Sequence, residues 1–357
     1  MAMKAAAFFV LLLGTVLVSA QEPTAPPTPK AEVFYAMETN ALGPGRVVHR
    51  ATVRRMVDSL ICRLTGKGTV AEAWRTLVSP ADRVGIKVAA SGRVVSGVHP
   101  EVVQAVAEGL VEAGVPAKNI IVWDRNMEDL LTAGFQKNSK LYTLEAIDPK
   151  TGYDPQAQVS APLVGKLIWG DSKFGDKKIS RFSDLLTNTE QLSSTSYYAK
   201  ILSTGVTKVI NIPSLTDSFM TGINGALANM TLSNLDNWRR FGKAAAEGDS
   251  YIAEIYADPL IREKVVLTIL DGLVLQYAGG PFPDGNFAID YFSLFASRDP
   301  VAIDATAMRL IEELRLAHKM PSIRTMSNYI EAAEMLGLGT FAEPRIQMIR
   351  VGVEGIR

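Results

Sequence analysis

Short apolar runs alternate with longer amphipathic segments along most of this chain. The runs that predict strands lie at residues 84–88, 120–123, 208–212, 265–270, 292–296 and 346–353. Most of them are continuously apolar, which is typical of strands buried on both faces. The helical patterns lie at residues 49–64, 69–78, 100–113, 215–230, 248–257, 300–316 and 325–336. Strands separated by helices predict an α/β fold with a mostly parallel central sheet and helices on both faces.

Residues 135–200 interrupt this pattern. They are rich in Gly, Ser, Thr, Asp and Lys and show weak periodicity, which favours an irregular insertion with room for a small hairpin. We expect residues 31–357 to form a single α/β domain around this insertion, with its core at 82–354.

The first twenty residues have the three parts of a secretory signal peptide. Lys4 is followed by an uncharged apolar stretch from Ala5 to Val18, and Ala20 precedes the expected cleavage point at Gln21. The alternative, an uncleaved anchor, is disfavoured because a spanning helix needs about 20 apolar residues. Residues 21–30 contain four prolines and predict an extended linker. We therefore expect an exported protein, periplasmic or extracellular, with no membrane contact after cleavage.

Composition excludes several classes of function. Lys plus Arg and Asp plus Glu balance at 37 each, so no net charge favours nucleic acid. Cys62 is the only cysteine, which excludes an intrachain disulfide and a cysteine-held iron–sulfur cluster. Three histidines leave little material for histidine catalysis. A small-molecule ligand and an oxygen-bound divalent cation stay open as partners, and the sequence predicts neither a specific cofactor nor an oligomeric state.

In an open parallel sheet, ligands bind beyond the carboxyl ends of the strands. Lys87 lies within an apolar strand, so it needs a partner or must extend to an edge. Asp124 ends the next strand, where it can bind a sugar hydroxyl or a metal, or cap a helix. The loop with Ser91, Gly92 and Arg93 suits an anion, although an ordinary solvated loop is the alternative.

Two later regions also carry polar residues at strand ends. Thr216, Asp217 and Asn229 lie in a segment dense in Asn, Asp, Ser and Thr, which favours turns, caps or ligand contacts. Asp271 ends a predicted strand. Asp299 starts a helix, where capping is the alternative to ligand binding, and Asp304 lies five residues further on.

Taken in order, several segments resemble the family called domain of unknown function 362 (DUF362). They include DRVGIKV, HPEVVQAVAEGLVEAGVPAKNIIVWD, KVINIPSL…TGINGALANM, ILDGL…GGP, ASRDPVAIDATAMRLIEEL and EAAEMLGLGTF…IRVGVEG. The resemblance implies an α/β fold of uncertain biochemistry, in which some members carry a ferredoxin-like module that this chain cannot hold. It implies that six family residues are retained: Lys87, Asp124, Asn229, Asp271, Asp299 and Asp304.

The chain also departs from the family pattern. Ala89 and Ala90 stand where the family commonly has asparagine, Thr216 and Ser218 replace its usual Lys and His, and Ala228 replaces the Lys of a Lys-Asn pair. If the lost groups bind a metal or an anion in relatives, the activity of this chain is weakened or altered.

Two functions follow as hypotheses. The first is an enzyme for a small anionic or metal-bound ligand, with Lys87, Asp124 and Asp271 as catalytic residues. The ligand-binding residues would then be Ser91, Gly92, Arg93, Thr216, Asp217, Asn229, Asp299 and Asp304. The alternative is an extracytoplasmic binding protein without turnover, which keeps a degenerate form of the family site.

Overall fold

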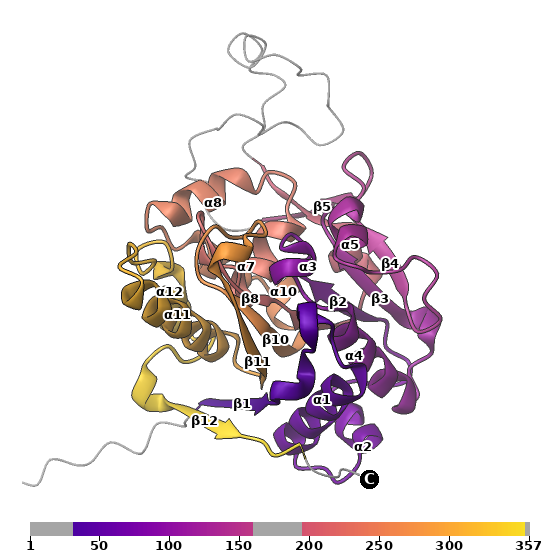
Figure 1. The fold of residues 1–357 in the computed structure, drawn as a ribbon. Coiled ribbons are helices and arrows are strands. Elements are labelled where there is room, and N and C mark those ends of the chain that lie inside the picture. Colours follow the sequence, from indigo (N-terminus) through magenta and orange to yellow (C-terminus); the bar gives the residue numbers. More distant parts are fainter. Residues whose placement is uncertain (1–30, 160–194, 354–357) are drawn as a thin grey trace, which may run out of the picture.

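The computed structural model describes residues 31–159 and 195–353. The predicted signal peptide and linker, and residues 160–194 of the predicted insertion, lie outside the described residues. Within these, eight strands form the main path of one mixed sheet (Figure 1). Their order across the sheet is β12 (Ile346–Arg350), β1 (Ala31–Met37), β11 (Ala288–Ser297), β10 (Val265–Gln276), β7 (Lys208–Ile212), β2 (Val84–Val88), β3 (Ile120–Asp124) and β4 (Thr143–Ala146).

Parallel pairing dominates this sheet. β10, β7, β2, β3 and β4 run parallel to one another, and β12 runs parallel to β1. β11 is antiparallel to both β1 and β10. A short strand β8 (Ser214–Ser218) adds to β10 in parallel and pairs with β9 (Gly222–Ile223) in antiparallel fashion. The mostly parallel α/β sheet is thus confirmed, with an antiparallel component that the sequence pattern did not indicate.

Two clusters of buried side chains lie on the two faces of the sheet. One contains Val84, Ile86 and Val88 of β2 together with residues of α1 (Arg50–Thr65), α2 (Val70–Arg75) and α4 (Pro100–Glu112). The other contains residues of α7 (Ala226–Thr231), α9 (Tyr251–Tyr256), α11 (Pro300–Ala317) and α12 (Asn328–Met335). Because alternate strand residues point to opposite faces, Lys87 points away from the first cluster and towards α7.

The remaining α-helices of the described residues are short. They are α3 (Arg93–Ser96), α5 (Met127–Thr132), α8 (Arg239–Ala246) and α10 (Pro259–Arg262). No helix in residues 31–159 or 195–353 is both long and apolar enough to cross a membrane.

The main departure from the predicted elements concerns residues 215–230, where the sequence indicated one helix. The structure has β8, β9 and then α7 in this segment. Two of the buried polar side chains of β8, Asp217 and Ser218, are satisfied by neighbouring backbone amides. Ser218 Oγ accepts hydrogen bonds from the amides of Met220 and Thr221, and Asp217 accepts one from Gly280. The predicted insertion contains β4, and its β5 (Tyr153–Gln158) pairs with β6 (Tyr197–Ala199) as a separate antiparallel sheet.

Candidate functional site

A pocket of about 250 Å³ lies at the carboxyl ends of β2, β3 and β8. Its wall is mostly apolar and includes three aromatic rings. It is lined by Ala89, Ser91, Asp124, Arg125, Asn126, Asp129, Ser218, Phe219, Met220, Thr221, Asn224, Ala228, Asn229, Leu232, Ser233, Trp238, Pro281 and Phe282. We call it the strand-end pocket.

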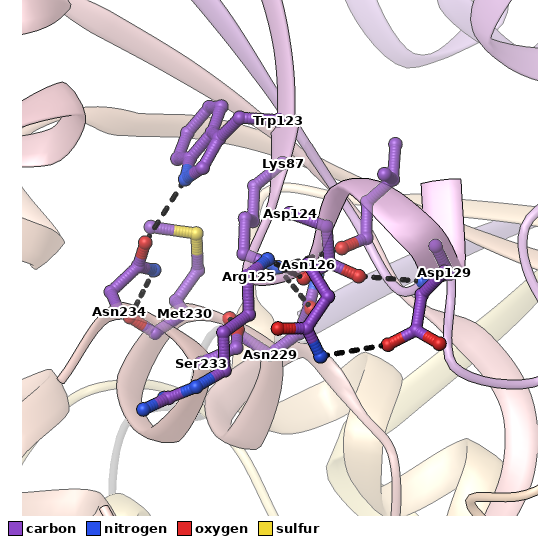
Figure 2. A network of polar contacts seen from close by, with 12 residues as sticks. Lys87, Trp123, Asp124, Arg125, Asn126, Asp129, Asn229, Met230, Ser233 and Asn234 are labelled. Carbon is purple, nitrogen blue, oxygen red and sulfur yellow. Dashed lines mark hydrogen bonds and ion pairs between the residues drawn. The ribbon is translucent and has the colours of Figure 1, made fainter. Parts of the chain in front are cut away.

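Lys87 lies beneath this pocket and is completely buried. Its Nζ donates to Asp124 Oδ1 at 2.8 Å, to Asn229 Oδ1 at 2.9 Å and to the carbonyl oxygen of Val88 at 2.6 Å, as Figure 2 shows for the two side-chain partners. These three acceptors use all three ammonium protons. Burial lowers the pKa of Lys87, and the nearby Asp124 acts in the opposite direction. Lys87 therefore holds the site together from below and does not reach a ligand directly.

Asp124 connects Lys87 to the pocket. Its Oδ1 also accepts the amide of Arg125 at 2.7 Å, and its Oδ2 accepts the amide of Ala90 at 2.8 Å. The side chain is only slightly exposed, and it lines the strand-end pocket. A carboxylate has about four acceptor positions, so these three bonds leave one position on Oδ2 for a ligand. The structure thus places a fixed and charge-compensated carboxylate at the pocket.

Asn229 fixes Lys87 from the other side through α7. Its Nδ2 donates to Asn211 Oδ1 on β7 at 2.8 Å, and Asn211 Nδ2 donates to the carbonyl oxygen of Ala226 at 2.9 Å. The chain of hydrogen bonds therefore runs from β3 through Lys87 to α7 and back to β7. Asn211 was not predicted as a site residue. It could have been found in the same way as Lys87, because it is a polar residue within the apolar run KVINI.

The start of α7 is held by a residue far along the chain. Asp304, on α11, accepts the amides of Ala226 and Leu227, the latter at 2.9 Å. A Cβ on Gly225 would lie 2.3 Å from Asp304 Oδ1, so glycine is required for this close approach. Burial raises the pKa of Asp304 to about 7. Asp304 therefore caps α7 and is not among the residues that line the pocket.

Arg125 closes one side of the strand-end pocket. Its guanidinium donates to the carbonyl oxygens of Leu235 at 2.7 Å and Asp236 at 3.2 Å, and it lies 5.3 Å from the ring centroid of Trp238. Burial lowers the pKa of this guanidinium. Because its donors are directed at backbone carbonyls, Arg125 joins the end of β3 to the Trp238 segment.

Two exposed phenylalanine rings lie at the pocket. Phe219 and Phe282 are 58% and 62% exposed and are stacked with centroids 6.4 Å apart. Asp217 fixes their backbones, since its Oδ1 accepts the amide of Gly280 at 2.8 Å, and the Phe219 amide donates to the Gly280 carbonyl at 3.0 Å. Burial raises the pKa of Asp217 to about 6. Sequence reasoning missed this aromatic pair, because two separate phenylalanines show no pattern before the chain folds.

The other predicted residues are distributed over several places. Asp271 is buried against His99, whose Nδ1 and backbone amide both lie within hydrogen-bond distance of Asp271 Oδ2. Asp299 caps α11 through the amides of Val301 and Ala302 and also accepts the Thr340 amide. Both therefore have structural partners, and neither lines the strand-end pocket.

The predicted loop after β2 is divided between two cavities. Ser91 lines the strand-end pocket, whereas Arg93 lines a second and larger cavity. Gly92 lies between them in a tight turn, where a Cβ would lie 2.4 Å from the Gly97 nitrogen. Thr216 is buried on β8, and its hydroxyl has no hydrogen-bond partner among the described residues. The structure thus joins Lys87, Asp124 and Asn229 and separates them from Arg93 and Asp271.

The strand-end pocket offers mainly hydrogen-bond acceptors to a ligand. Its wall contributes the carboxylates Asp124 and Asp129, and the one cation in the wall, Arg125, is bound to backbone carbonyls. Among the described residues, no group of three or more His, Cys, Asp or Glu side chains is arranged to hold a metal ion. A ligand that donates hydrogen bonds or carries positive charge fits this wall better than an anion does.

Comparison with known families agrees with the resemblance seen in the sequence. The model of the family described as Domain of unknown function (DUF362) matches residues 84–309, which is more than half of the chain. The protein belongs to this family. The match includes the residues that line the strand-end pocket, together with Lys87 and Asp304.

No curated protein matches the chain. Among solved structures, the chain is similar to a crystal structure of a protein from Thermotoga maritima, with 10% sequence identity and a TM-score of 0.36. The alignment covers 81% of this chain and 59% of that one. This similarity is too distant to support an argument about function.

Proposed function

We propose that this protein is exported and binds a small organic molecule in the strand-end pocket, with Asp124 as the polar anchor. The observation that carries the proposal is the free acceptor position on Asp124 Oδ2, which lies in a mostly apolar wall. Small-molecule sites usually combine such an apolar wall with a few fixed polar groups. The ligand class is a molecule with an aromatic or aliphatic body and an amino or hydroxyl group.

Charge supports a donor or cationic ligand over an anionic one at this pocket. Lys87 offers no free proton to a ligand, and Arg125 already serves the Leu235 and Asp236 carbonyls. The aromatic rings of Trp238, Phe219 and Phe282 lie in the same wall and can contact either an apolar body or a cation.

A three-probe comparison tests the ligand class. Benzylamine, benzyl alcohol and benzoate carry the same ring with a cationic, a neutral and an anionic polar group. We expect benzylamine to bind most tightly and benzoate most weakly, as measured by calorimetry or by quenching of tryptophan fluorescence. In Asp124→Asn, the affinity for benzylamine should fall by about tenfold or more, because a hydrogen bond to a charged group is lost.

Two further variants complete this experiment. Glu128→Gln changes an exposed acid next to the pocket that does not line it, so benzylamine binding should be unchanged. Phe282→Ser removes an exposed ring of the wall and should weaken binding of benzylamine without lowering stability. Equal or tighter binding of benzoate, or an unchanged benzylamine affinity in Asp124→Asn, would contradict the proposal.

An enzyme is the second candidate function, and the same carboxylate supports it. Asp124 Oδ2 is placed to accept a proton from a bound hydroxyl or ammonium group, and Lys87 would compensate the charge of that carboxylate in the ground state. Turnover of a bound amine or alcohol that is lost in Asp124→Asn would establish this function. Binding without turnover would leave the chain a binding protein.

Export is tested by the mass of the protein that an exporting bacterial host produces. The start of the sequence, with Lys4, the apolar stretch and the small residues up to Ala20, supports cleavage before Gln21. We expect the purified protein to begin at Gln21. The variant Ala20→Phe replaces the small residue at the cleavage point and should retain Met1. Retention of Met1 in the unchanged protein would favour the membrane-anchor alternative.

A further inference from the structure

A second cavity, of about 750 Å³, lies between the start of α1, the α3–α4 segment and the residues after α5. It shares no lining residue with the strand-end pocket. Its charged lining residues are Arg46, Arg50, Arg93, Glu101 and Lys140, and His99 lies in the same wall. Four cations face one acid, so the cavity has the opposite charge character to the strand-end pocket.

Two of these four cations, Arg93 and Lys140, are free to bind a ligand, whereas the other two are paired with acids. Arg46 pairs with Asp290 at 2.6 Å, and Arg50 pairs with Glu108. Arg93 and Lys140 are exposed, and no acidic group in the part of the chain that the structure describes lies within ion-pair distance of either. The positive charge of Arg93 and Lys140 is therefore uncompensated at the cavity wall.

His99 is fixed with one ring nitrogen away from the cavity. Its Nδ1 lies 2.9 Å from Asp271 Oδ2, and its backbone amide donates to the same oxygen at 2.7 Å. Asp271 is 1% exposed and therefore cannot reach a ligand itself. No hydrogen bond to Nε2 comes from residues 31–159 or 195–353. Asp271 thus sets the ring orientation and leaves Nε2 as the nitrogen available to a ligand.

The charges around His99 favour its protonated form. Burial lowers the pKa of the imidazole, but Asp271 outweighs this effect through its charge and hydrogen bond, and Glu101 adds to it. Arg46 acts in the opposite direction, and the net result is a pKa above the ordinary histidine value. Arg93 and Lys140 are the other charged groups of this wall that have no acidic partner.

The backbone at the cavity is also unusual. Arg46 and Arg93 both have positive φ, at 61° and 50°, a conformation that side chains other than glycine rarely adopt. Strained backbone of this kind is concentrated at functional sites, where the surrounding structure holds a side chain in one direction. Two of the cations around the cavity are thus presented from such positions.

We propose that this cavity binds the phosphate group of a small molecule, with Arg93 and Lys140 supplying the charge and His99 Nε2 donating a hydrogen bond. Three donors, two from the α3–α4 segment and one from the residues after α5, suit a dianion better than a single carboxylate. The volume also leaves room for the organic part of the ligand. The proposal is independent of the function proposed for the strand-end pocket.

Sulfate is the first probe, because it stays a dianion throughout the range in which histidine titrates. Binding is measured by calorimetry on the full mature chain, with chloride keeping the ionic strength constant. We expect Arg93→Gln and Lys140→Gln each to weaken sulfate binding by about threefold to tenfold. The matched control Arg63→Gln changes an exposed arginine of α1 that does not line the cavity, and it should have no effect.

The pH series tests the role of His99. Sulfate binding should weaken by about tenfold between about pH 6 and about pH 8.5, as the imidazole loses its proton. In His99→Gln, whose amide can still face Asp271, this dependence should disappear. Glycerol 3-phosphate should bind and glycerol should not, which identifies the phosphate as the recognised group. Sulfate binding no tighter than chloride binding, or binding unchanged in Arg93→Gln and Lys140→Gln, would overturn the proposal.

Discussion

Lys87→Met is expected to lower the free energy of unfolding by about 3–5 kcal/mol, because it removes one partner of a buried ion pair. Methionine keeps the length of the side chain but leaves Asp124 without its compensating charge. It also leaves the side-chain oxygen Oδ1 of Asn229 and the backbone carbonyl oxygen of Val88 without their donor. Urea denaturation followed by circular dichroism measures the change.

The double variant Lys87→Met with Asp124→Asn separates charge from packing. With no charge left uncompensated, it should be more stable than Lys87→Met alone, which is the coupling that a double-mutant cycle detects. Lys118→Met changes an exposed lysine shortly before β3 and should alter stability by no more than about 0.5 kcal/mol. If Lys87→Met were as stable as that control, the ion pair would not hold the site together.

Asp304→Ala should also destabilise strongly, by about 1–3 kcal/mol for each of the two buried amides that it leaves unsatisfied. These amides belong to Ala226 and Leu227 at the start of α7. The variant should weaken benzylamine binding as well, although Asp304 does not line the pocket, because α7 carries Asn229. Glu313→Ala, at an exposed position of α11, is the matched control and should change neither property.

The effect of Asp304→Ala should depend on pH. Burial raises the pKa of Asp304 in the folded protein to about 7, above the ordinary aspartate value of 3.8. Between these two pH values the folded state binds more protons than the unfolded state. The contribution of Asp304 to the free energy of unfolding is therefore complete below the lower value and declines as pH rises towards about 7. The stability difference between the unchanged protein and Asp304→Ala should therefore be larger at about pH 5 than at about pH 8. An equal difference at both values would mean that Asp304 stays ionised when buried.

Strand and helix positions were predictable where burial is two-sided or a helix start is marked. β2 and β7 occupy the ranges that their apolar runs predict, and α4 begins at Pro100 with Glu101 in its first turn. The β8 strand could not be found in this way. Its five residues are all buried although most are polar, and the amide of Gly280 that satisfies Asp217 lies 63 positions further along the chain.

The candidate site was also predictable only in part. Lys87, within an apolar strand, and Asp124, at the end of the next strand, stand out in the sequence without any knowledge of the fold. In the structure, Lys87 Nζ lies 2.8 Å from Asp124 Oδ1. The pairing of Asp271 with His99 and of Asp304 with α7 depends on sequence separations of 172 residues and 77 or 78 residues. Such partners are set by the packing of the whole sheet and leave no local pattern.

The cap that Asp304 places on α7 also constrains the order in which the protein can mature. Every residue that lines the strand-end pocket precedes position 283, yet the amides that fix α7 find their acceptor only on α11. A chain that ended after Phe282 would contain the full set of lining side chains and would still lack an ordered pocket. The ligand binding that we propose for this pocket would therefore be acquired late in synthesis and folding, after α11 has docked. Occupancy of the strand-end pocket would then report that α11 has been synthesised and has docked.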